Sequence, residues 1–475
     1  MTVARKSRDN PFPAGTVVSD SIAPFANYFG HSFADGKARI DIFKESFSEG
    51  QPQRSTMGIR GQFGSGKTHL AFQLADYFTH NTQSRMIYTK IDHVDFLDLY
   101  KNAFARKFDE ESLKSVVAMH IAKLLRQKSP ASGVAEVRGM SLTDIAQKEV
   151  DNAVKTNPQY VLDLVTEDLL PVSGLGLELD YQIEDSPSVA RDFFKAYSRI
   201  KDSNLSKLGV RWIRGEQLTN SEREDLGLDL AAINQPSHAK EAMRFLLEAH
   251  RKANIEVLFC VDEFERIAVR GTPQDRAATP GLIKDLAEMF SKTGHIFLLS
   301  GIDDAWSAMP ADVFDRINRQ DIIEMRLTNE ECEGLIDQYC TNEKFAVSEL
   351  FERDSTAFLF EVGGRNPRQV LHIAHHAFQS TGGKRRIGRA DIVEGANKAL
   401  SDPNRIKSVQ ENVERVAQNL GLGVQKDRQV GDARYSYVLG PANKPSILVN
   451  IMQSIFKEDE GFCPDSCRKV EGVFS

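Results

Sequence analysis

The sequence predicts an α/β fold of parallel strands alternating with helices, on three observations. A glycine-rich segment at 61–68 joins a short apolar run to a segment with helical spacing. Residues 255–261 form an apolar run broken by one charge, as expected for a parallel strand covered on both faces. Further apolar runs at 295–299 and 322–327 alternate with helical patterns. Strands separated by helices favour right-handed crossovers and a three-layer core.

The composition is that of a soluble globular protein. Hydrophobic residues make up 41% and charged residues 27% of the 475 positions, enough chain for about three domains. Apolar runs stay well below the roughly 20 residues that span a membrane, and residues 1–10 lack the apolar part of a secretory signal. Five scattered cysteines favour a reducing compartment. We therefore expect a cytoplasmic protein with no membrane segment.

Segment composition suggests four regions. Residues 1–50 form a polar lead followed by helix, and residues 51–327 form the α/β core. Within that core, about 130–235 mixes helical patterns with glycine- and proline-bearing turns, which indicates a mostly helical insertion. Residues 328–400 are expected to be helical throughout, as a lid, and 401–475 to form a small α/β segment.

Each core element has a local reason. The apolar run at 56–60 suits a buried strand, and apolar residues recur with helical spacing over 70–78. A second strand is expected at 86–92, a helical stretch at 96–125 and a helix at 237–252.

The outer segments are predicted from the same patterns. The expected elements are an amphipathic stretch at 22–47, about four helices within 328–400 with breaks at 363–364 and 381–383, a helix near 405–420, and strands near 435–438 and 447–451.

The glycine-rich segment matches G-x-x-x-x-G-K-T, a spacing with a physical purpose. Its glycines let successive N–H groups curl around a phosphate, Lys67 reaches the β- and γ-phosphates, and Thr68 offers a hydroxyl to Mg²⁺. We therefore expect a site for a nucleoside triphosphate, ATP, with Mg²⁺. The expected binding residues are Gly61, Gln62, Phe63, Gly64, Ser65, Gly66, Lys67, Thr68 and His69.

A pair of acidic residues ends the apolar strand at 255–261. Hydrolysis needs a metal anchor and a group that orients or deprotonates water. Asp262 suits the Mg²⁺ shell and Glu263 suits the catalytic base, with Glu265 as a weaker rival. Acidic residues are also common at the ends of strands without any catalytic role. The assignment of this pair therefore depends on the phosphate-binding motif at 61–68.

Together these motifs resemble the AAA+ ATPases, closest to their origin-recognition branch and the related signalling ATPases. The resemblance implies a polar sensor at the tip of the fourth strand, where Ser300 stands. It also implies an arginine finger just before the fifth strand that reaches a neighbouring subunit's γ-phosphate. Arg316 matches that place, and Arg319 is the alternative. Either arginine could instead form an ordinary ion pair on the surface.

The helical segment at 328–400 resembles the lid of the same family. Thr328 or Asn329 would cap its first helix. The motif at 363–368 is similar to the second sensor, in which Arg368, or alternatively Arg365, would approach the nucleotide.

The long insertion departs from a minimal AAA+ core. Residues 212–216 and 226–227 resemble a motif in ATPases of bacterial anti-phage systems of the BREX kind. The insertion would then contact a partner or nucleic acid, unless it is a structural helical cap.

Three functions fit these features. The first is an oligomeric ATPase that assembles on, or remodels, DNA or a partner protein, with Arg316 acting between subunits. The net charge of −7 does not favour general polyanion binding, although a local basic face would suffice for DNA. The second is a STAND-like switch that hydrolyses slowly, although a long sensor-repeat region is absent from the sequence. The third, a P-loop kinase, is disfavoured by the Asp262–Glu263 pair and the helical lid.

Overall fold

The computed structural model describes most of the chain. The described residues are 10–13, 30–48, 55–80, 84–92, 94–128, 136–137, 140–141, 162, 188–202, 204–325, 327–383, 385–400, 414, 417, 422–430, 433–440 and 447–449. Among them, no helix combines the length and the apolar character needed to cross a membrane.

The chain divides into two compact units. The core unit comprises Gly30–Phe63 and Lys67–Met325, and the terminal unit comprises Met1–Phe29, Gly64–Gly66 and Arg326–Ser475.

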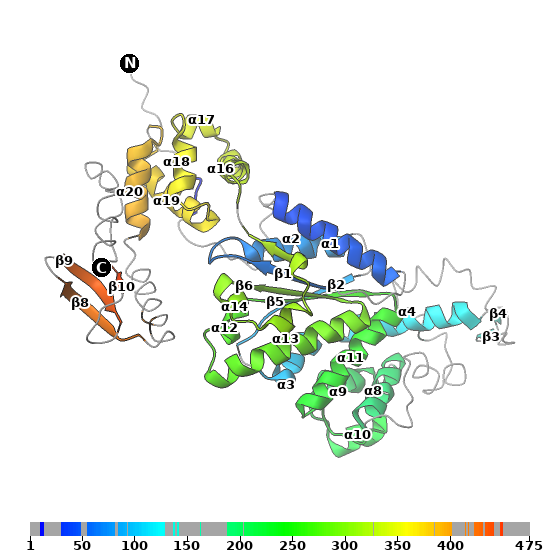
Figure 1. Ribbon diagram of the computed structural model, residues 1–475. Coiled ribbons are helices and arrows are strands. Elements are labelled where there is room, and N and C mark those ends of the chain that lie inside the picture. Colours follow the sequence, from blue (N-terminus) through cyan, green and yellow to red (C-terminus); the bar gives the residue numbers. More distant parts are fainter. Residues whose placement is uncertain are drawn as a thin grey trace. The chain divides into compact units, whose positions relative to one another are not determined.

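A five-stranded parallel sheet forms the centre of the core unit (Figure 1). The strand order is β2-β5-β6-β1-β7, and every pairing is parallel. The strands are β1 (Thr56–Arg60), β2 (Ser84–Lys90), β5 (Glu256–Asp262), β6 (Ile296–Gly301) and β7 (Ile322–Glu324). β6 therefore lies between the strand that leads into the glycine-rich loop and the strand that ends in the acidic pair. The predicted α/β class with parallel strands is confirmed.

Helices cover both faces of this sheet (Figure 1). α1 (Gly30–Ser48) and α2 (Lys67–His80) lie on one face, and α11 (Pro236–Lys252) and α13 (Pro273–Thr293) on the other. The apolar stripe of α2 is buried against the sheet, as its spacing predicted; it consists of Leu70, Ala71, Leu74, Ala75 and Phe78. All seven residues of β5 are buried, which explains its continuous apolar sequence. This arrangement agrees with the predicted three-layer core.

Some predicted boundaries shift. The helical stretch expected at 96–125 is broken into α3 (Phe96–Asp98), a π-helical segment (Leu99–Phe104), a 3₁₀ turn (Ala105–Lys107) and α4 (Glu110–Lys128). β7 ends at Glu324, although the apolar pattern runs to residue 327. The backbone N–H of Met325 still donates to the carbonyl of Arg60 at 2.7 Å, so the chain continues beside β1 without extending the strand.

Short helices connect the later strands of the core unit. They are α12 (Glu265–Ala268), α14 (Asp303–Ser307), α15 (Ala311–Phe314) and a 3₁₀ turn (Arg319–Asp321).

The described part of the insertion is mostly helical. It contains α8 (Ser188–Ser198), which lies beside α11, and α9 (Ser206–Ile213) and α10 (Asn220–Leu226), which follow it in the same cluster (Figure 1). Two short paired strands, β3 (Glu136–Val137) and β4 (Met140–Ser141), complete it. Much of the predicted insertion, including 142–161 and 163–187, lies outside the described residues.

The motif at 212–216 has a structural role in the insertion. Trp212 is fully buried and donates its indole N–H to the Leu230 carbonyl at 3.0 Å. Arg214 Nε donates to the Phe108 carbonyl at 2.8 Å, which ties the insertion to the residues before α4. Gly215 has a φ of +79°, which favours glycine.

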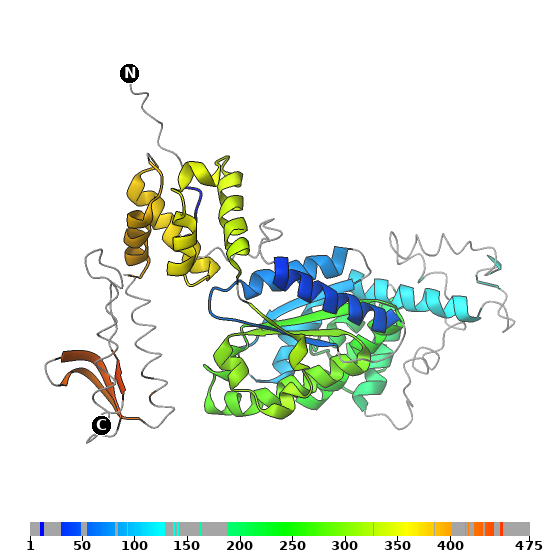
Figure 2. The same cartoon turned by 45° about the horizontal axis from the view of Figure 1, so that its top comes forward.

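The terminal unit contains a helical bundle and a small sheet (Figure 2). Its helices are α16 (Asn329–Asn342), α17 (Val347–Leu350), α18 (Ser355–Val362), α19 (Pro367–Thr381) and α20 (Arg389–Leu400). The hydroxyl of Thr328 accepts from Glu331 N at the start of α16, so Thr328 is the cap rather than Asn329. Antiparallel strands follow at β8 (Val424–Val430), β9 (Ala433–Leu439) and β10 (Ile447–Val449).

Two predicted segments lie largely outside the described residues. They are the polar lead, apart from 10–13, and the helix near 405–420, of which the structure describes Glu414 and Ala417 as helical. The amphipathic stretch expected at 22–47 is described from residue 30 onward, as α1.

Candidate functional site

The glycine-rich loop joins the carboxyl end of β1 to the first residue of α2. Gly64 and Gly66 have φ values of +78° and +93°, which residues with a side chain rarely adopt. The N–H of Gly61 donates to the Gly301 carbonyl at 3.4 Å, which attaches the start of the loop to the end of β6. The loop conformation therefore depends on the glycines that the motif specifies.

Lys67 is turned into the loop that precedes it. Its ammonium donates to the carbonyls of Gly61 and Gln62, each at 3.0 Å, and the residue is 7% exposed. Burial lowers the pKa of Lys67, while the nearby carboxylates oppose the change, Glu265 most strongly and then Asp262. The result is a cation enclosed at the N-terminus of a helix, where the helix dipole also favours anions.

Two other loop residues differ in environment. Ser65 is buried, and its hydroxyl has no hydrogen-bond partner within the described part of the chain. Phe63 is 48% exposed, and the Arg270 guanidinium lies 4.8 Å from the centre of its ring. A buried donor with no protein acceptor is costly, so the Ser65 hydroxyl suits an acceptor that binds in the loop.

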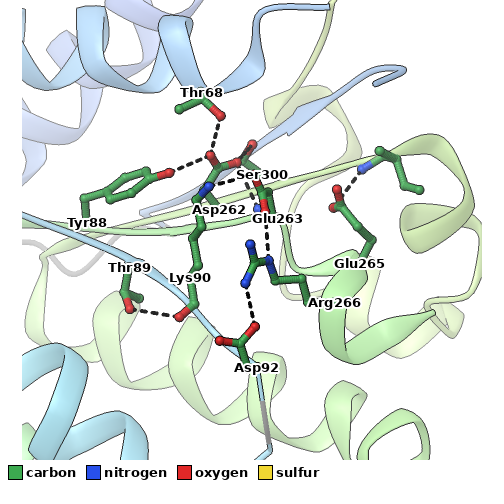
Figure 3. A network of polar contacts seen from close by, with 11 residues as sticks. Thr68, Tyr88, Thr89, Lys90, Asp92, Asp262, Glu263, Glu265, Arg266 and Ser300 are labelled. Carbon is green, nitrogen blue, oxygen red and sulfur yellow. Dashed lines mark hydrogen bonds and ion pairs between the residues drawn. The ribbon is translucent and has the colours of Figure 1, made fainter. Parts of the chain in front are cut away.

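Asp262 is the meeting point of three elements (Figure 3). This fully buried residue at the end of β5 accepts from Thr68 Oγ1 at 2.5 Å, Ser300 Oγ at 2.6 Å and Tyr88 OH at 2.9 Å. The donors belong to α2, β6 and β2. Thr68, Asp262 and Ser300 were singled out from the sequence, and the fold brings all three together. Burial, followed by the charge of Asp262, raises the pKa of Tyr88, so its hydroxyl keeps its proton.

Glu263 points away from Thr68 and is held by two cations (Figure 3). Its Oε1 lies 2.7 Å from Lys90 Nζ, and its Oε2 lies 2.8 Å from Arg266 Nε. Arg266 also pairs with Asp92 at 2.6 Å. We call Lys90, Asp92, Glu263 and Arg266 the clamp. Burial raises the pKa of Glu263, but its bonds to Lys90 and Arg266 outweigh this effect, so the net pKa is lowered and the carboxylate is charged.

The backbone of Glu263 is also unusual. Its φ of +54° lies in the left-handed region, which is uncommon for a residue with a side chain. Such conformations cost on the order of 1–3 kcal/mol and are found often at functional sites.

Glu265 occupies a different environment from Glu263. It is 1% exposed and accepts from the N–H of Ile302 at 3.3 Å. Burial raises its pKa, whereas the charge of Lys67 and this backbone bond lower it in part. Of the two glutamates, Glu265 has the stronger electrostatic influence on Lys67, and Glu263 is the one paired with Lys90 and Arg266.

The candidate finger residues lie where the sequence places them, just before β7. Arg316 is exposed in the turn after α15. Arg319 begins the 3₁₀ turn and lies 5.2 Å from the ring centre of Phe314. The exposure of Arg316 suits a contact with a second molecule, whereas Arg319 is partly engaged by its own chain.

The two candidate second-sensor residues belong to the terminal unit. Arg368 is exposed at the second position of α19, and Pro367 occupies the first. The side chain of Asn366 accepts from Gln369 N at 3.4 Å and caps the helix. Arg365 is exposed in the preceding turn, with a φ of +55°. The role of either arginine at a nucleotide stays a prediction.

Sequence reasoning missed the contribution of β2. Tyr88 and Lys90 alternate along this strand, so their side chains share one face, and the parallel register sets Lys90 beside Asp262. A search for polar residues at the carboxyl end of every predicted strand would have found both, because parallel strands bring these ends to one edge.

Comparison with protein-family models and with curated proteins gave no match for this chain.

Proposed function

We propose that this chain is a Mg²⁺-dependent ATPase of the AAA+ type. The observation that carries the proposal is the 2.5 Å hydrogen bond between Thr68 Oγ1 and Asp262 Oδ2, which joins residues 194 positions apart in the sequence. It sets a helix-terminal hydroxyl beside a buried carboxylate, the two groups that metal-assisted phosphoryl chemistry requires at one point.

The loop supplies donors for the phosphates of the substrate. Successive backbone N–H groups, the Lys67 ammonium and the unsatisfied Ser65 hydroxyl all suit phosphate oxygens. Lys67 would exchange the carbonyls of Gly61 and Gln62 for β- and γ-phosphate oxygens. The Lys67 ammonium would therefore have hydrogen-bond acceptors both before and after the substrate binds.

Thr68 and Asp262 fit Mg²⁺, since it prefers hydroxyl, carboxylate and water oxygens. When bound there, Mg²⁺ would neutralise charge on the β- and γ-phosphates. Ser300 and Tyr88 would keep the Asp262 carboxylate in position by donating to it.

Glu263 is our candidate for the group that accepts a proton from the attacking water. Its lowered pKa keeps it charged and able to accept a proton. Both of its oxygens are bonded to cations in this structure, so at least one of these bonds must be given up for it to bind water. Turnover would then depend on release of the clamp.

The work that ATP drives is proposed from the sequence resemblance. Oligomer formation fits Arg316, which is exposed before β7 and would act at the active site of a neighbouring subunit. Assembly on, or remodelling of, DNA or a partner protein follows from the same resemblance, as does a role in bacterial phage defence.

A second candidate function, a slow ATP-binding switch, is favoured by the clamp. A base held by Lys90 and Arg266 would make hydrolysis slow until a trigger loosens it. The two functions share one site and differ in what stimulates turnover.

The proposal is tested by measuring phosphate release from ATP with Mg²⁺ and with EDTA. We expect Mg²⁺-dependent turnover that Lys67→Ala abolishes, while Lys292→Ala, at an exposed lysine paired with Glu288, serves as the matched control. Absence of ATP binding by the wild-type chain would overturn the proposal. Stimulation by duplex DNA that weakens with salt would favour the assembly function over the switch.

Subunit mixing tests the finger. If sites are shared, mixtures of Lys67→Ala and Arg316→Ala chains regain turnover, because some sites combine an intact loop with an intact finger. Replacing Arg316→Ala by Arg319→Ala in the mixture distinguishes the two arginines. Turnover equal to the sum of the separate residual rates would reject a shared site.

A further inference from the structure

Two histidines on α19 lie side by side, outside the proposed ATPase site. His372 and His376 are one helical turn apart, both are partly buried, and their Nε2 atoms are separated by 3.2 Å. Their ring centres lie 4.8 Å apart. Both belong to α19 of the terminal unit, so a single helix positions the two rings.

The separation of the two nitrogens matches that of two ligands on one metal ion. With metal–nitrogen bonds of about 2.0–2.1 Å, two imidazole nitrogens are about 2.9 Å apart at neighbouring positions of a tetragonal ion and about 3.3 Å apart on a tetrahedral one. Histidines at positions i and i+4 of a helix point to the same side. An ion could therefore bridge the two rings with little movement of either side chain.

His376 also has a partner for its second ring nitrogen. Its Nδ1 lies 3.3 Å from Gln379 Oε1. With the proton on Nδ1 donated to that amide oxygen, Nε2 carries the lone pair that a metal needs.

The charges around the pair are balanced. Lys398 of α20 would oppose a bound cation, but its ammonium is 2.6 Å from Glu394 Oε1 and 3.1 Å from Ser380 Oγ. The third histidine, His375, is buried on another side of the helix, where its Nδ1 lies 2.7 Å from the Phe12 carbonyl. It serves a structural contact and is not part of the pair.

We propose that His372 and His376 bind one divalent transition-metal ion that prefers imidazole, of the class of Cu²⁺, Ni²⁺ and Zn²⁺. The described residues contain no group of three or more His, Cys, Asp or Glu that could hold a metal. The plainer account of the geometry is an Nε2–H···Nε2 hydrogen bond with no metal, and the experiment separates the two.

The test uses the full chain with any affinity tag removed, titrated with CuCl₂ or NiCl₂ at pH 7.5 and followed by calorimetry. The double variant His372→Ala/His376→Ala should bind one metal ion fewer per chain than the wild type. Each single variant should bind that ion at least about tenfold more weakly. Copper electron paramagnetic resonance should report two nitrogen ligands in the wild type and one in each single variant. Copper should bind more tightly than nickel or zinc.

Matched variants distinguish loss of the proposed site from misfolding and from metal binding at other histidines. His80→Ala removes an exposed histidine at the end of α2 and should leave the stoichiometry unchanged. His372→Gln and His376→Gln keep polar side chains in place, and circular dichroism compares their fold with the wild type. Equal metal binding in wild type and double variant, or no binding by the wild type, would overturn the proposal. ATP hydrolysis is measured separately, so either result leaves the ATPase proposal standing.

Discussion

The Lys90 ammonium lies 2.7 Å from Oε1 of Glu263, across the gap between the ends of two neighbouring strands. β2 and β5 are paired so that Lys90 is opposite Asp262, and Glu263 is the next residue. The register of the two strands thus determines that the Lys90 ammonium and the candidate base Glu263 lie close together. A change at Lys90 should therefore affect catalysis without affecting the fold.

Lys90→Gln should raise basal turnover. Loss of one partner frees Glu263 to bind water, while Arg266 still holds its other oxygen. Because both side chains are about a third exposed, we expect the pair to contribute only about 0.5–1 kcal/mol, or about two- to fivefold in kcat. The measurement is steady-state ATP hydrolysis, with Lys90→Arg as a control that keeps the charge. A fall in kcat would mean that Lys90 assists the reaction.

Glu263→Gln and Glu265→Gln should differ in effect. Removing a general base typically costs 10²-fold or more in rate, so Glu263→Gln should retain ATP and lose about 10²-fold in kcat. Glu265→Gln should keep turnover within about threefold, since this buried carboxyl bonds to the Ile302 N–H and is not bound to water in our proposal. Equilibrium binding of a fluorescent ATP analogue checks that both variants bind. If the two outcomes are reversed, Glu265 is the base.

Tyr88→Phe should weaken the response to Mg²⁺. The variant removes one of the donors that orient Asp262 and keeps the ring in its tilted contact with Phe72, whose ring centre is 4.7 Å away. Loss of a hydrogen bond to a charged group predicts about a tenfold rise in the Mg²⁺ concentration for half-maximal rate. Tyr77→Phe, which removes an exposed hydroxyl bonded to Asp41, is the matched control. An unchanged Mg²⁺ response together with a lower kcat would mean that Tyr88 does not act by positioning the Asp262 carboxylate for Mg²⁺.

Glu256 should make stability depend on pH. This residue is 5% exposed at the start of β5, and its Oε1 has no hydrogen-bond partner among the described residues. Burial raises its pKa to about 7, although the charge of Lys44 opposes the rise. The neutral carboxyl stabilises the folded state fully below its ordinary value of 4.5. That contribution falls as pH rises and is gone above about 7.

The matching variant is Glu256→Gln, which stays neutral at every pH. Relative to wild type, its free energy of unfolding should rise by on the order of 3 kcal/mol between pH 4.5 and 8. Urea unfolding followed by tryptophan fluorescence measures this change in the core unit, which contains both Trp212 and Trp306. Glu45→Gln, at an exposed position on α1, should show no such trend. A constant difference across pH would contradict the prediction.

The sequence was most informative where one local pattern decides the structure. The loop, the helix after it and the strand ending at Asp262 follow from glycine placement and apolar spacing, and the structure contains all of them. The strand order was beyond local reasoning, since pairing of β6 between β1 and β5 depends on contacts between distant segments. The carboxyl end of the second predicted strand could have drawn attention to Tyr88 and Lys90, but their pairing with the acidic residues depends on β2 being the neighbour of β5, which no local pattern specifies.

The outermost place of β2 in the sheet has a consequence for how this architecture can vary. The chain leaves β2, passes through a long segment whose described part is mostly helical, and returns as β5, the immediate neighbour of β2. Residues inserted between β2 and β5 would leave the hydrogen bonds of the sheet intact, because these two strands pair directly with each other. The excursion between β2 and β5 is thus a place where residues can be inserted or exchanged without disturbing the strand ends at which Lys90 and Asp262 lie side by side.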